Sequence, residues 1–264
     1  MGFIVGILIV FMGTLSGAAC VLLLKGELGN NTKKLLLGFA AGVMMAASVW
    51  SLLIPALELA ASLGVYGLGG KLVVIPVAVG FLLGIAFLLL LDDLIPHLHV
   101  DSSVPEGHKA QLKRSTMTFL AVTLHNIPEG MAVGVVFAAA AVERHPVATA
   151  AALTLSVGIA VQNFPEGAIV SMSLKGGGEG KLKAFALGVA SGAVEPLAAA
   201  LAFCLRHVIA AVLPLVLSFA AGAMIYVITE ELIPEASSDP HSNFGTLGFA
   251  AGFVLMMILD VTLG

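Results

Sequence analysis

The sequence predicts an all-α integral membrane protein. Of its 264 residues, 59% are hydrophobic and only 11% are charged, and the mean hydropathy is +1.08. Soluble domains are about 45–50% apolar and about 25% charged. The apolar residues form long unbroken runs, whereas a membrane β-barrel would show alternation within strands of about ten residues. We therefore expect a multi-pass helical protein of the cell membrane, with the lipid bilayer as its surroundings and no nucleic acid partner.

Eight apolar runs are long enough to cross a bilayer as helices. They cover residues 3–24, 35–57, 72–95, 116–142, 147–174, 184–205, 208–233 and 244–263. Only Arg206 and His207 separate the sixth run from the seventh, and the short link 143–146 joins the fourth to the fifth. No basic segment precedes the first run, so we expect it to remain as a helix rather than be removed as a signal peptide.

A single transmembrane domain, 1–264, is expected. Its parts are spans one to three (1–95), a His-containing loop (96–115), spans four and five (116–174) and spans six to eight (184–264). Nine Lys and Arg residues follow odd-numbered spans and three follow even-numbered spans. The nine are Lys25, Lys33, Lys34, Lys109, Lys113, Arg114, Lys175, Lys181 and Lys183, and the three are Lys71, Arg144 and Arg206. Because cytoplasmic loops carry an excess of Lys and Arg, we expect the loops after odd-numbered spans to be cytoplasmic and both termini to be extracytoplasmic.

The first three spans recur weakly in the last three. "LGFAAGVMM" at 37–45 matches "LSFAAGAMI" at 217–225 at six of nine positions, and "GFLLGIAFLLLLD" at 80–92 matches "GFAAGFVLMMILD" at 248–260 at five of thirteen. Partners five spans apart cross the membrane in opposite directions. The order therefore predicts a 3+2+3 inverted-repeat bundle, which transporters use to build a site near the membrane centre. The alternative is an ordinary helix bundle in which the glycines serve close packing.

The two central spans carry related polar motifs, "HNIPEG" in the fourth and "QNFPEG" in the fifth. In the first motif, His125 and Glu129 are four residues apart and share one helix face, with Asn126 beside them. Pro128 cannot donate a backbone hydrogen bond to the preceding turn, so we expect a kink that opens the helix at this point. The second motif repeats the pattern with Gln162, Asn163, Pro165 and Glu166.

Glu129 and Glu166 converge if these two spans pack with their polar faces together. Carboxylates in a low-dielectric interior repel each other unless a proton or a cation neutralises them. A site that combines imidazole with carboxylate favours Zn, Fe, Mn, Co or Ni over Ca or Mg. Two alternatives stay open, a pair of kinked helices whose polar residues only pack, and a proton relay without metal. Glu195 in the sixth span and Met44 in the second are further candidate ligands.

Acidic and His residues near the span ends are candidates for a transport pathway. They are Asp92, Asp260, Glu230, Glu231, His97 and His99. An ion that reaches or leaves a central site would pass such groups, and the alternative is that they are ordinary solvated helix ends.

With these spacings, "HNIPEG" followed by "QNFPEG" resembles the motifs of the ZIP (Zrt/Irt-like) divalent metal transporters, in particular the bacterial GufA-like branch. The resemblance covers the whole chain and implies a binuclear site. The implied ligands of the first metal are His125, Glu129, Gln162, Glu166 and Met44, and those of the second are Asn126, Glu129, Glu166 and Glu195. Asn163 stands where some relatives carry an acidic residue and others Asn. The resemblance also implies an outer entrance near Asp260 and an inner exit near Asp92, Glu230, Glu231, His97 and His99.

The function that the resemblance implies is import of Zn²⁺ into the cytoplasm, with Fe²⁺, Mn²⁺, Co²⁺ and Cd²⁺ as further candidate substrates and no cofactor besides the transported ion. Rival functions are a cation/proton antiporter or metal exporter built on the same bundle, and a metal-sensing membrane protein. No "HExxH" motif is present, which argues against an intramembrane metalloprotease and against enzyme activity. The Gly- and Ala-rich outer faces suit either a homodimer contact or packing within the chain.

Overall fold

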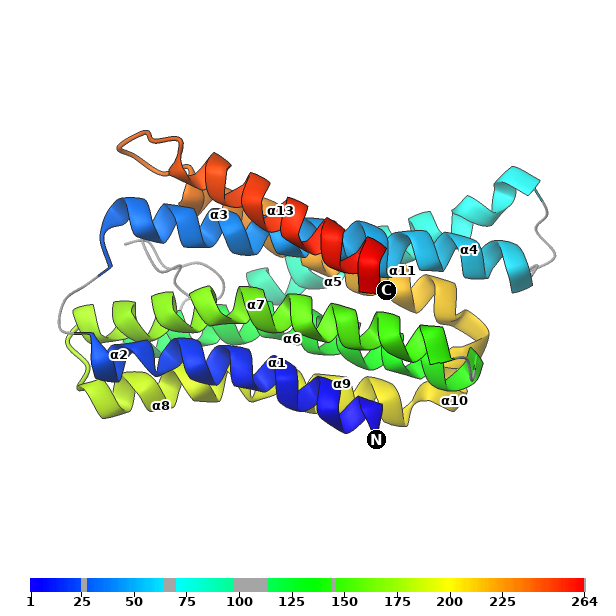
Figure 1. Ribbon diagram of the computed structural model, residues 1–264, viewed down its shortest axis with the longest axis horizontal. Helices are drawn as coiled ribbons and strands as arrows, with labels where there is room; N and C mark the ends of the chain where they lie inside the picture. The colour runs from blue at the N-terminus through cyan, green and yellow to red at the C-terminus, as the bar shows by residue number, and fades with distance from the viewer. Residues whose placement is uncertain (25–27, 64–69, 97–113, 144–145, 264) are drawn as a thin grey trace.

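Helices account for all the regular secondary structure in the part of the chain that the computed structural model describes, residues 1–24, 28–63, 70–96, 114–143 and 146–263. The elements are α1 (Gly2–Ala18), α2 (Cys20–Leu23), α3 (Asn30–Ala47), η1 (Ser48–Leu53), α4 (Ile54–Leu63), η3 (Gly70–Val73), α5 (Val74–Leu94), α6 (Arg114–Glu143), α7 (Pro146–Gly176), α8 (Lys181–Gly192), α9 (Val194–Cys204), α10 (Arg206–Ile209), η4 (Ala210–Val212), α11 (Leu213–Val227), η5 (Ile228–Leu232), α12 (Ile233–Ala236) and α13 (Phe244–Leu263). The long helices run along the long axis of the molecule (Figure 1). The predicted all-α class is confirmed.

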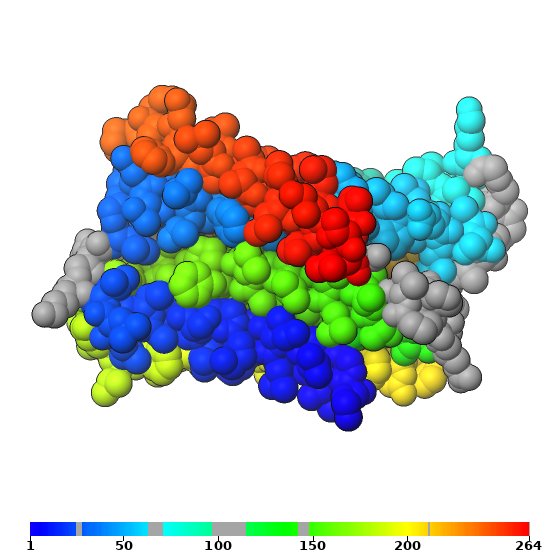
Figure 2. All heavy atoms as spheres, viewed as in Figure 1, coloured from blue at the N-terminus to red at the C-terminus, as the bar shows by residue number. Residues whose placement is uncertain are grey.

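The long helices are arranged in two layers (Figure 1). In the first layer, α1 packs on α7 and α6 packs on α9, with α8 against α7. In the second layer, α3 packs on α13 and α5 packs on α11. The layers meet where α7 contacts α3 and where α6 contacts α11. In the space-filling view, α13, α3, α7 and α1 lie side by side across one face of the molecule (Figure 2).

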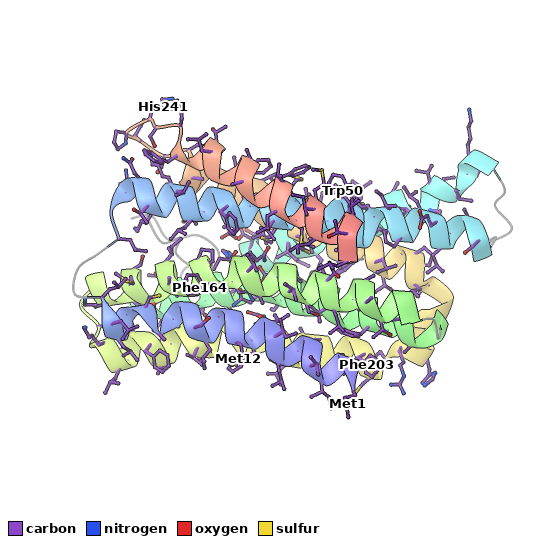
Figure 3. The ribbon with its side chains drawn as sticks, in the orientation of Figure 1. Met1, Met12, Trp50, Phe164, Phe203 and His241 are labelled. Atoms are coloured by element: carbon purple, nitrogen blue, oxygen red, sulfur yellow. The ribbon has the colours of Figure 1, made fainter. Side chains whose placement is uncertain are left out.

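Seven helical segments in the described residues are long and apolar enough to cross a membrane. They are Gly2–Leu23, Asn30–Ser62, Lys71–Leu94, Ser115–Ala141, Lys181–Cys204, Leu213–Ala236 and Phe244–Leu263. The one predicted span without a counterpart among the seven is the fifth, 147–174, which corresponds to α7, a helix of 31 residues. Exposed apolar side chains, among them Met12 and Phe164 (Figure 3), suit the surface of these helices to lipid.

The second predicted span begins five residues earlier than expected, at Asn30 rather than 35. Lys33 and Lys34 were predicted to lie in a loop, and instead they lie in the first turns of α3. Lys34 is buried, and its ammonium group donates hydrogen bonds to the backbone carbonyl oxygens of Ser238 and Pro240, at 2.6 Å for the latter. These carbonyls replace the water that an ammonium group would lose on burial. The two hydrogen bonds also hold the connection between α12 and α13 against the start of α3.

The sixth and seventh predicted spans are not continuous α-helices. The sixth is divided at Ala193 into α8 and α9, two residues before Glu195. The seventh was expected to begin at 208, but its long helix α11 begins at Leu213, after the short elements α10 and η4. Two π-helical segments were not predicted, η1 at the end of α3 and η5 at the end of α11. Such segments occur often at functional sites. They do not change the hydrophobic periodicity of the sequence, so the sequence did not predict them.

Glycines bring the helices of the second layer into backbone contact. Where a Cβ would stand, the partner helix places a carbonyl oxygen at 2.0–2.1 Å in several pairs, and four of them are Gly42 with Phe249, Gly252 with Phe39, Gly222 with Phe81, and Gly84 with Phe219. The first two contacts join α3 to α13, and the last two join α11 to α5. The glycine faces that suited either dimer contacts or internal packing are therefore used, at these positions, inside the chain.

Gly84→Ala should lower the free energy of unfolding by about 1–3 kcal/mol, because the new methyl group overlaps the Phe219 carbonyl oxygen and forces α5 away from α11. Thermal unfolding of the detergent-purified protein measures the effect. Gly177→Ala is the matched control, since its Cβ would meet other atoms only at 3.5 Å, an ordinary contact distance. An unchanged unfolding temperature for Gly84→Ala would contradict the close approach of these helices.

Candidate metal centre

The two polar motifs lie on neighbouring helices of the first layer, the first on α6 and the second on α7. Both helices continue through their internal prolines, Pro128 and Pro165, without a break in helical structure. A proline cannot donate to the carbonyl one turn earlier, so the carbonyl groups of Leu124 and Val161 lose their usual helical donors. These carbonyls directly precede the first polar residue of each motif, His125 and Gln162.

Glu129 is the most enclosed acidic group of the molecule's described part. Its side chain is 0% exposed, and neither carboxylate oxygen accepts a hydrogen bond. Gln162 is equally buried, and both its amide atoms also lack partners, as does Oδ1 of Asn163. Buried polar groups are nearly always hydrogen-bonded in native proteins. This concentration of unsatisfied oxygen and nitrogen atoms is what a site for a bound cation requires.

Glu195 lies beside this group, in the first turn of α9. It is buried, and both of its oxygens accept hydrogen bonds, from Thr14 Oγ1 at 3.0 Å and from Asn163 Nδ2 at 2.8 Å. Acidic side chains are favoured in the first turn of a helix by the exposed N–H groups there. Asn126 is held similarly, because its Nδ2 donates to the backbone oxygen of Ser191 on α8 at 2.9 Å.

Four carboxylates are close enough to interact electrostatically at this centre. Glu129 interacts with Glu166 and with Glu195, and Glu166 interacts with Glu231 on η5. In a low-dielectric interior, such groups repel each other strongly unless they are neutralised. The predicted convergence of Glu129 and Glu166 is therefore present in the structure, and a positive charge between them would offset their repulsion.

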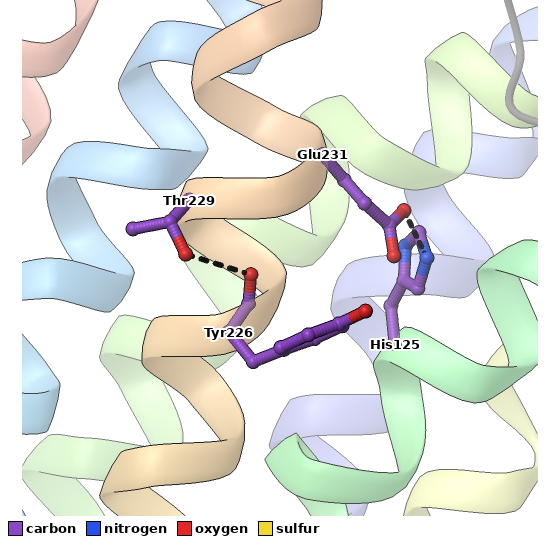
Figure 4. Close-up of polar contacts among 4 residues, drawn as sticks. All are labelled: His125, Tyr226, Thr229 and Glu231. Carbon is purple, nitrogen blue, oxygen red and sulfur yellow. Dashed lines mark hydrogen bonds and ion pairs between the residues drawn. The ribbon is translucent and has the colours of Figure 1, made fainter. Parts of the chain in front are cut away.

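His125 faces the second layer. Its Nε2 forms a close ion pair with Glu231, and the Tyr226 ring of α11 extends toward the pair (Figure 4). The Thr229 hydroxyl donates to the Tyr226 carbonyl oxygen at 3.1 Å in the same turn. A cavity of about 40 Å³ opens beside the pair and is lined by apolar residues and by four polar ones. The polar lining residues are His125, Glu166, Glu231 and Glu235.

The remaining predicted residues lie apart from this centre or outside the described chain. Met44 is fully buried in the apolar core on α3. Asp260 lies on α13, where its Oδ1 accepts a hydrogen bond from Ser51 Oγ of η1 at 2.6 Å. Asp92, at the end of α5, lies beside Tyr226, as does Glu230. His97 and His99 belong to the residues that the structure does not describe.

Three contributors were missed in the sequence: Thr14, Ser51 and Tyr226. Each is a lone polar group within an apolar run. That signal marks it as unusual, but does not say which helix it faces. Thr14 contacts a residue 181 positions away and Ser51 a residue 209 positions away. Only the packing of α1 against α9 and of η1 against α13 brings these groups together.

In the described residues, no three His, Cys, Asp or Glu side chains already form a metal-ligand set. The centre instead combines Glu129 and Glu166 with one imidazole and with the amides of Gln162 and Asn163. Oxygen-rich sites with one nitrogen ligand suit divalent transition metals of intermediate softness. The donors and their unsatisfied atoms therefore fit a cation, which would draw them into closer contact on binding.

These features define a class of protein: a multi-pass helical membrane protein with an acidic centre buried between its helices. Comparison with known proteins agrees. The family described as "ZIP Zinc transporter" matches residues 102–260. "Zinc transporter GufA" of Myxococcus xanthus is 38% identical over 254 residues, which cover 96% of both chains. "Zinc transporter ZIPB" of Bordetella bronchiseptica is 37% identical over 96% of this chain and 79% of its own. "Zinc transporter ZIP11" of Homo sapiens is 35% identical over 86% of this chain and 87% of its own. The chain belongs to the ZIP family.

Glu129→Met should stabilise the protein in the presence of a metal chelator, because it removes a buried carboxylate whose oxygens lack hydrogen bonds and replaces it with an apolar chain of similar length. Zinc at about 100 times its dissociation constant should stabilise the wild type by about 2.7 kcal/mol and the variant much less. Thermal unfolding with chelator and with zinc measures both effects. Glu58→Met, at an exposed position on α4, is the control. Equal stabilisation by zinc in both proteins would count against Glu129 as a ligand.

Proposed function

We propose that this protein imports divalent transition-metal ions, Zn²⁺ foremost, across the cell membrane into the cytoplasm. The observation that carries the proposal is the fully buried Glu129 carboxylate, which lacks a hydrogen-bond partner and lies among Glu166, Glu195, the unsatisfied Gln162 amide and the unsatisfied Oδ1 of Asn163. A buried carboxylate without a partner does not stabilise the fold, so its presence indicates a function. Binding of a cation is the function that a buried negative charge suits. The relatives named as zinc transporters support Zn²⁺ as the ion, with Fe²⁺, Mn²⁺, Co²⁺ and Cd²⁺ as further substrates.

In this proposal α7 also crosses the membrane, as the fifth of eight spans. Its 31 residues are sufficient to cross a bilayer, and α1, α3 and α6 surround it. Its polar groups are thereby turned toward protein rather than lipid. The chain then crosses the membrane an even number of times, with both termini outside. The N and C ends lie toward the same end of the molecule (Figure 1), as this topology requires.

The contacts also support the 3+2+3 inverted repeat. If residues 37–45 are superposed on 217–225, and 80–92 on 248–260, the contact of Gly42 with Phe249 becomes that of Gly222 with Phe81. The packing of α1 on α7 likewise becomes the packing of α9 on α6, and η1 becomes η5. An ordinary bundle has no reason to repeat its contacts residue by residue.

The proposed metal site has two adjoining parts. The first consists of His125, Glu129, Gln162 and Glu166, with Met44 of α3 as a proposed further ligand. The second consists of Asn126, Asn163 and Glu195, and shares Glu129 and Glu166. Both amide atoms of Gln162, in the first part, lack hydrogen-bond partners. We therefore place the transported ion in the first part.

The pathway runs from Asp260 on the outer side, through the first part of the site, to the cavity lined by Glu231 and Glu235. In the structure His125 is paired with Glu231. We propose that this pair re-forms when the ion leaves His125 toward the inner side. Asp92 and Glu230 lie beside Tyr226, and we assign them to the inner part of the pathway. His97 and His99, which lie outside the described residues, stay predicted members of the same pathway. We propose that the first layer moves against the second as a rigid group to expose the site to each side in turn.

Uptake of ⁶⁵Zn²⁺ into vesicles that contain the purified protein tests the function. Glu129→Ala and Glu166→Ala should each lower the initial rate at least tenfold, because each removes a shared ligand of the transported ion. Glu58→Ala, at an exposed position, should transport as the wild type does. Full uptake by both site variants would sink the assignment. Release of ⁶⁵Zn²⁺ from preloaded vesicles would identify an exporter. Uptake of ⁶⁵Zn²⁺ driven by a proton gradient directed out of the vesicles would identify an antiporter.

The proposed orientation is tested with single cysteines in a variant whose Cys20 and Cys204 are replaced by serine. A membrane-impermeant maleimide applied to intact cells should label a cysteine inserted directly after Met1, which is fully exposed, and not one at Glu179 in the link from α7 to α8. After the cells are opened, both should react. Labelling of the Glu179 position in intact cells would reverse the orientation.

A further inference from the structure

The Asn163 side chain occupies the space between two carboxylates. Its Nδ2 donates to Glu195 Oε2 at 2.8 Å, and the same amide lies beside the carboxylate of Glu129. Asn163 is buried, so water does not compete for these positions. An NH₂ group carries two hydrogens and a partial positive charge. The amide therefore stands where a cation that bridged Glu129 and Glu195 would stand.

Both carboxylate oxygens of Glu195 already accept a hydrogen bond from a protein side chain. Its Oε2 accepts from Asn163, and its Oε1 accepts from the Thr14 hydroxyl at 3.0 Å. Hydrogen bonds to an ionised carboxylate are about twice as strong as those between neutral groups. The orientation of the Asn163 amide is set by the same contact, because the reverse orientation would place Oδ1 against a carboxylate oxygen. A cation that took the place of the Asn163 amide between Glu129 and Glu195 would break the hydrogen bond to Oε2.

Charge balance points the same way. Glu231, the fourth carboxylate of the centre, is paired with His125, so Glu129, Glu166 and Glu195 supply the three remaining negative charges when ionised, and two dications among them would leave one uncompensated positive charge. One dication between Glu129 and Glu166 is balanced by those two, and Thr14 and Asn163 stabilise the third carboxylate. An uncompensated buried charge costs several kcal/mol. An acidic residue at position 163 would supply the fourth negative charge that a second dication needs.

We propose that the second part of the site is filled by the Asn163 amide in place of a metal ion, so that each chain binds a single divalent cation. The proposal rests on the metal transport proposed above and deepens it. Asn163 is then a residue that determines stoichiometry, and Thr14 and Glu195 position it. The centre is mononuclear even though its framework has room for two ions.

The experiment is a count of bound ions per chain. The full-length protein in detergent is equilibrated with Cd²⁺ or Zn²⁺, freed of unbound metal by gel filtration, and measured by plasma mass spectrometry together with native mass spectrometry. The wild type should bind one ion per chain. Asn163→Asp should bind two, because it removes the amide donor and adds a negative charge. Glu195→Gln should still bind one, since Glu195 is not a ligand in the wild type.

Two bound ions in the wild type, falling to one in Glu195→Gln, would overturn the proposal while leaving metal transport intact. If Asn163→Asp binds a single ion per chain, Asn163 does not determine the number of bound ions, and the proposal is overturned. If this variant does not fold, the comparison of the wild type with Glu195→Gln still decides the matter. Wild-type protein that binds no ion and takes up no ⁶⁵Zn²⁺ into vesicles would instead defeat the proposed function itself.

Discussion

The rest of the structure depends on holding four carboxylates together inside the helix bundle, where Glu166 alone of the four is partly exposed. Glu129 is completely buried, and Glu166, Glu195 and Glu231 are within electrostatic range of it or of each other. Such groups tend to separate, and only the rigidity of the surrounding helices keeps them together. Glycine contacts supply that rigidity. At Gly130 the backbone of α6 touches the backbone of Glu195, so the helix that carries Glu129 cannot move away from α9 without losing its packing.

Contacts within each layer differ in kind from contacts between the layers. Within the layers, small residues let backbones touch, as on α3 and α13 or on α5 and α11. Between them, the described contacts include the ion pair of His125 with Glu231 and the polar surroundings of the small cavity. Backbone packing of this type resists sliding, whereas an ion pair can exchange one of its partners for a bound ion. The boundary between the layers is therefore where movement costs least, and the site lies directly beside it.

The sequence predicts most of the helices because length and hydropathy decide whether a segment spans a membrane. The last span was predicted at 244–263, and α13 is Phe244–Leu263. The start of α3 was missed because Lys34 was expected in water, and its buried ammonium group is satisfied by carbonyls some 200 residues away. The π-helical turns could not be predicted for a related reason, since they depend on packing between helices and not on the local pattern. α7 was predicted at 147–174 and is Pro146–Gly176, although the polar residues of its motif interrupt the apolar run.

For the site, the motifs place His125, Glu129, Gln162 and Glu166 on facing helices, and helical spacing alone predicts that much. It does not predict which side chains satisfy one another. Asn126 and Asn163 occupy equivalent places in the two motifs, yet the first donates to the backbone of Ser191 and the second to the carboxylate of Glu195. The proposed repeat accounts for this difference. If "SGA" at 16–18 is superposed on "SGA" at 191–193, the position that corresponds to Glu195 is Cys20, the first residue of α2, so the acidic partner exists on one side only. Under that proposal, a symmetric framework carries unequal side chains, and the centre can present different groups to the two sides of the membrane, as directional transport by an inverted repeat requires.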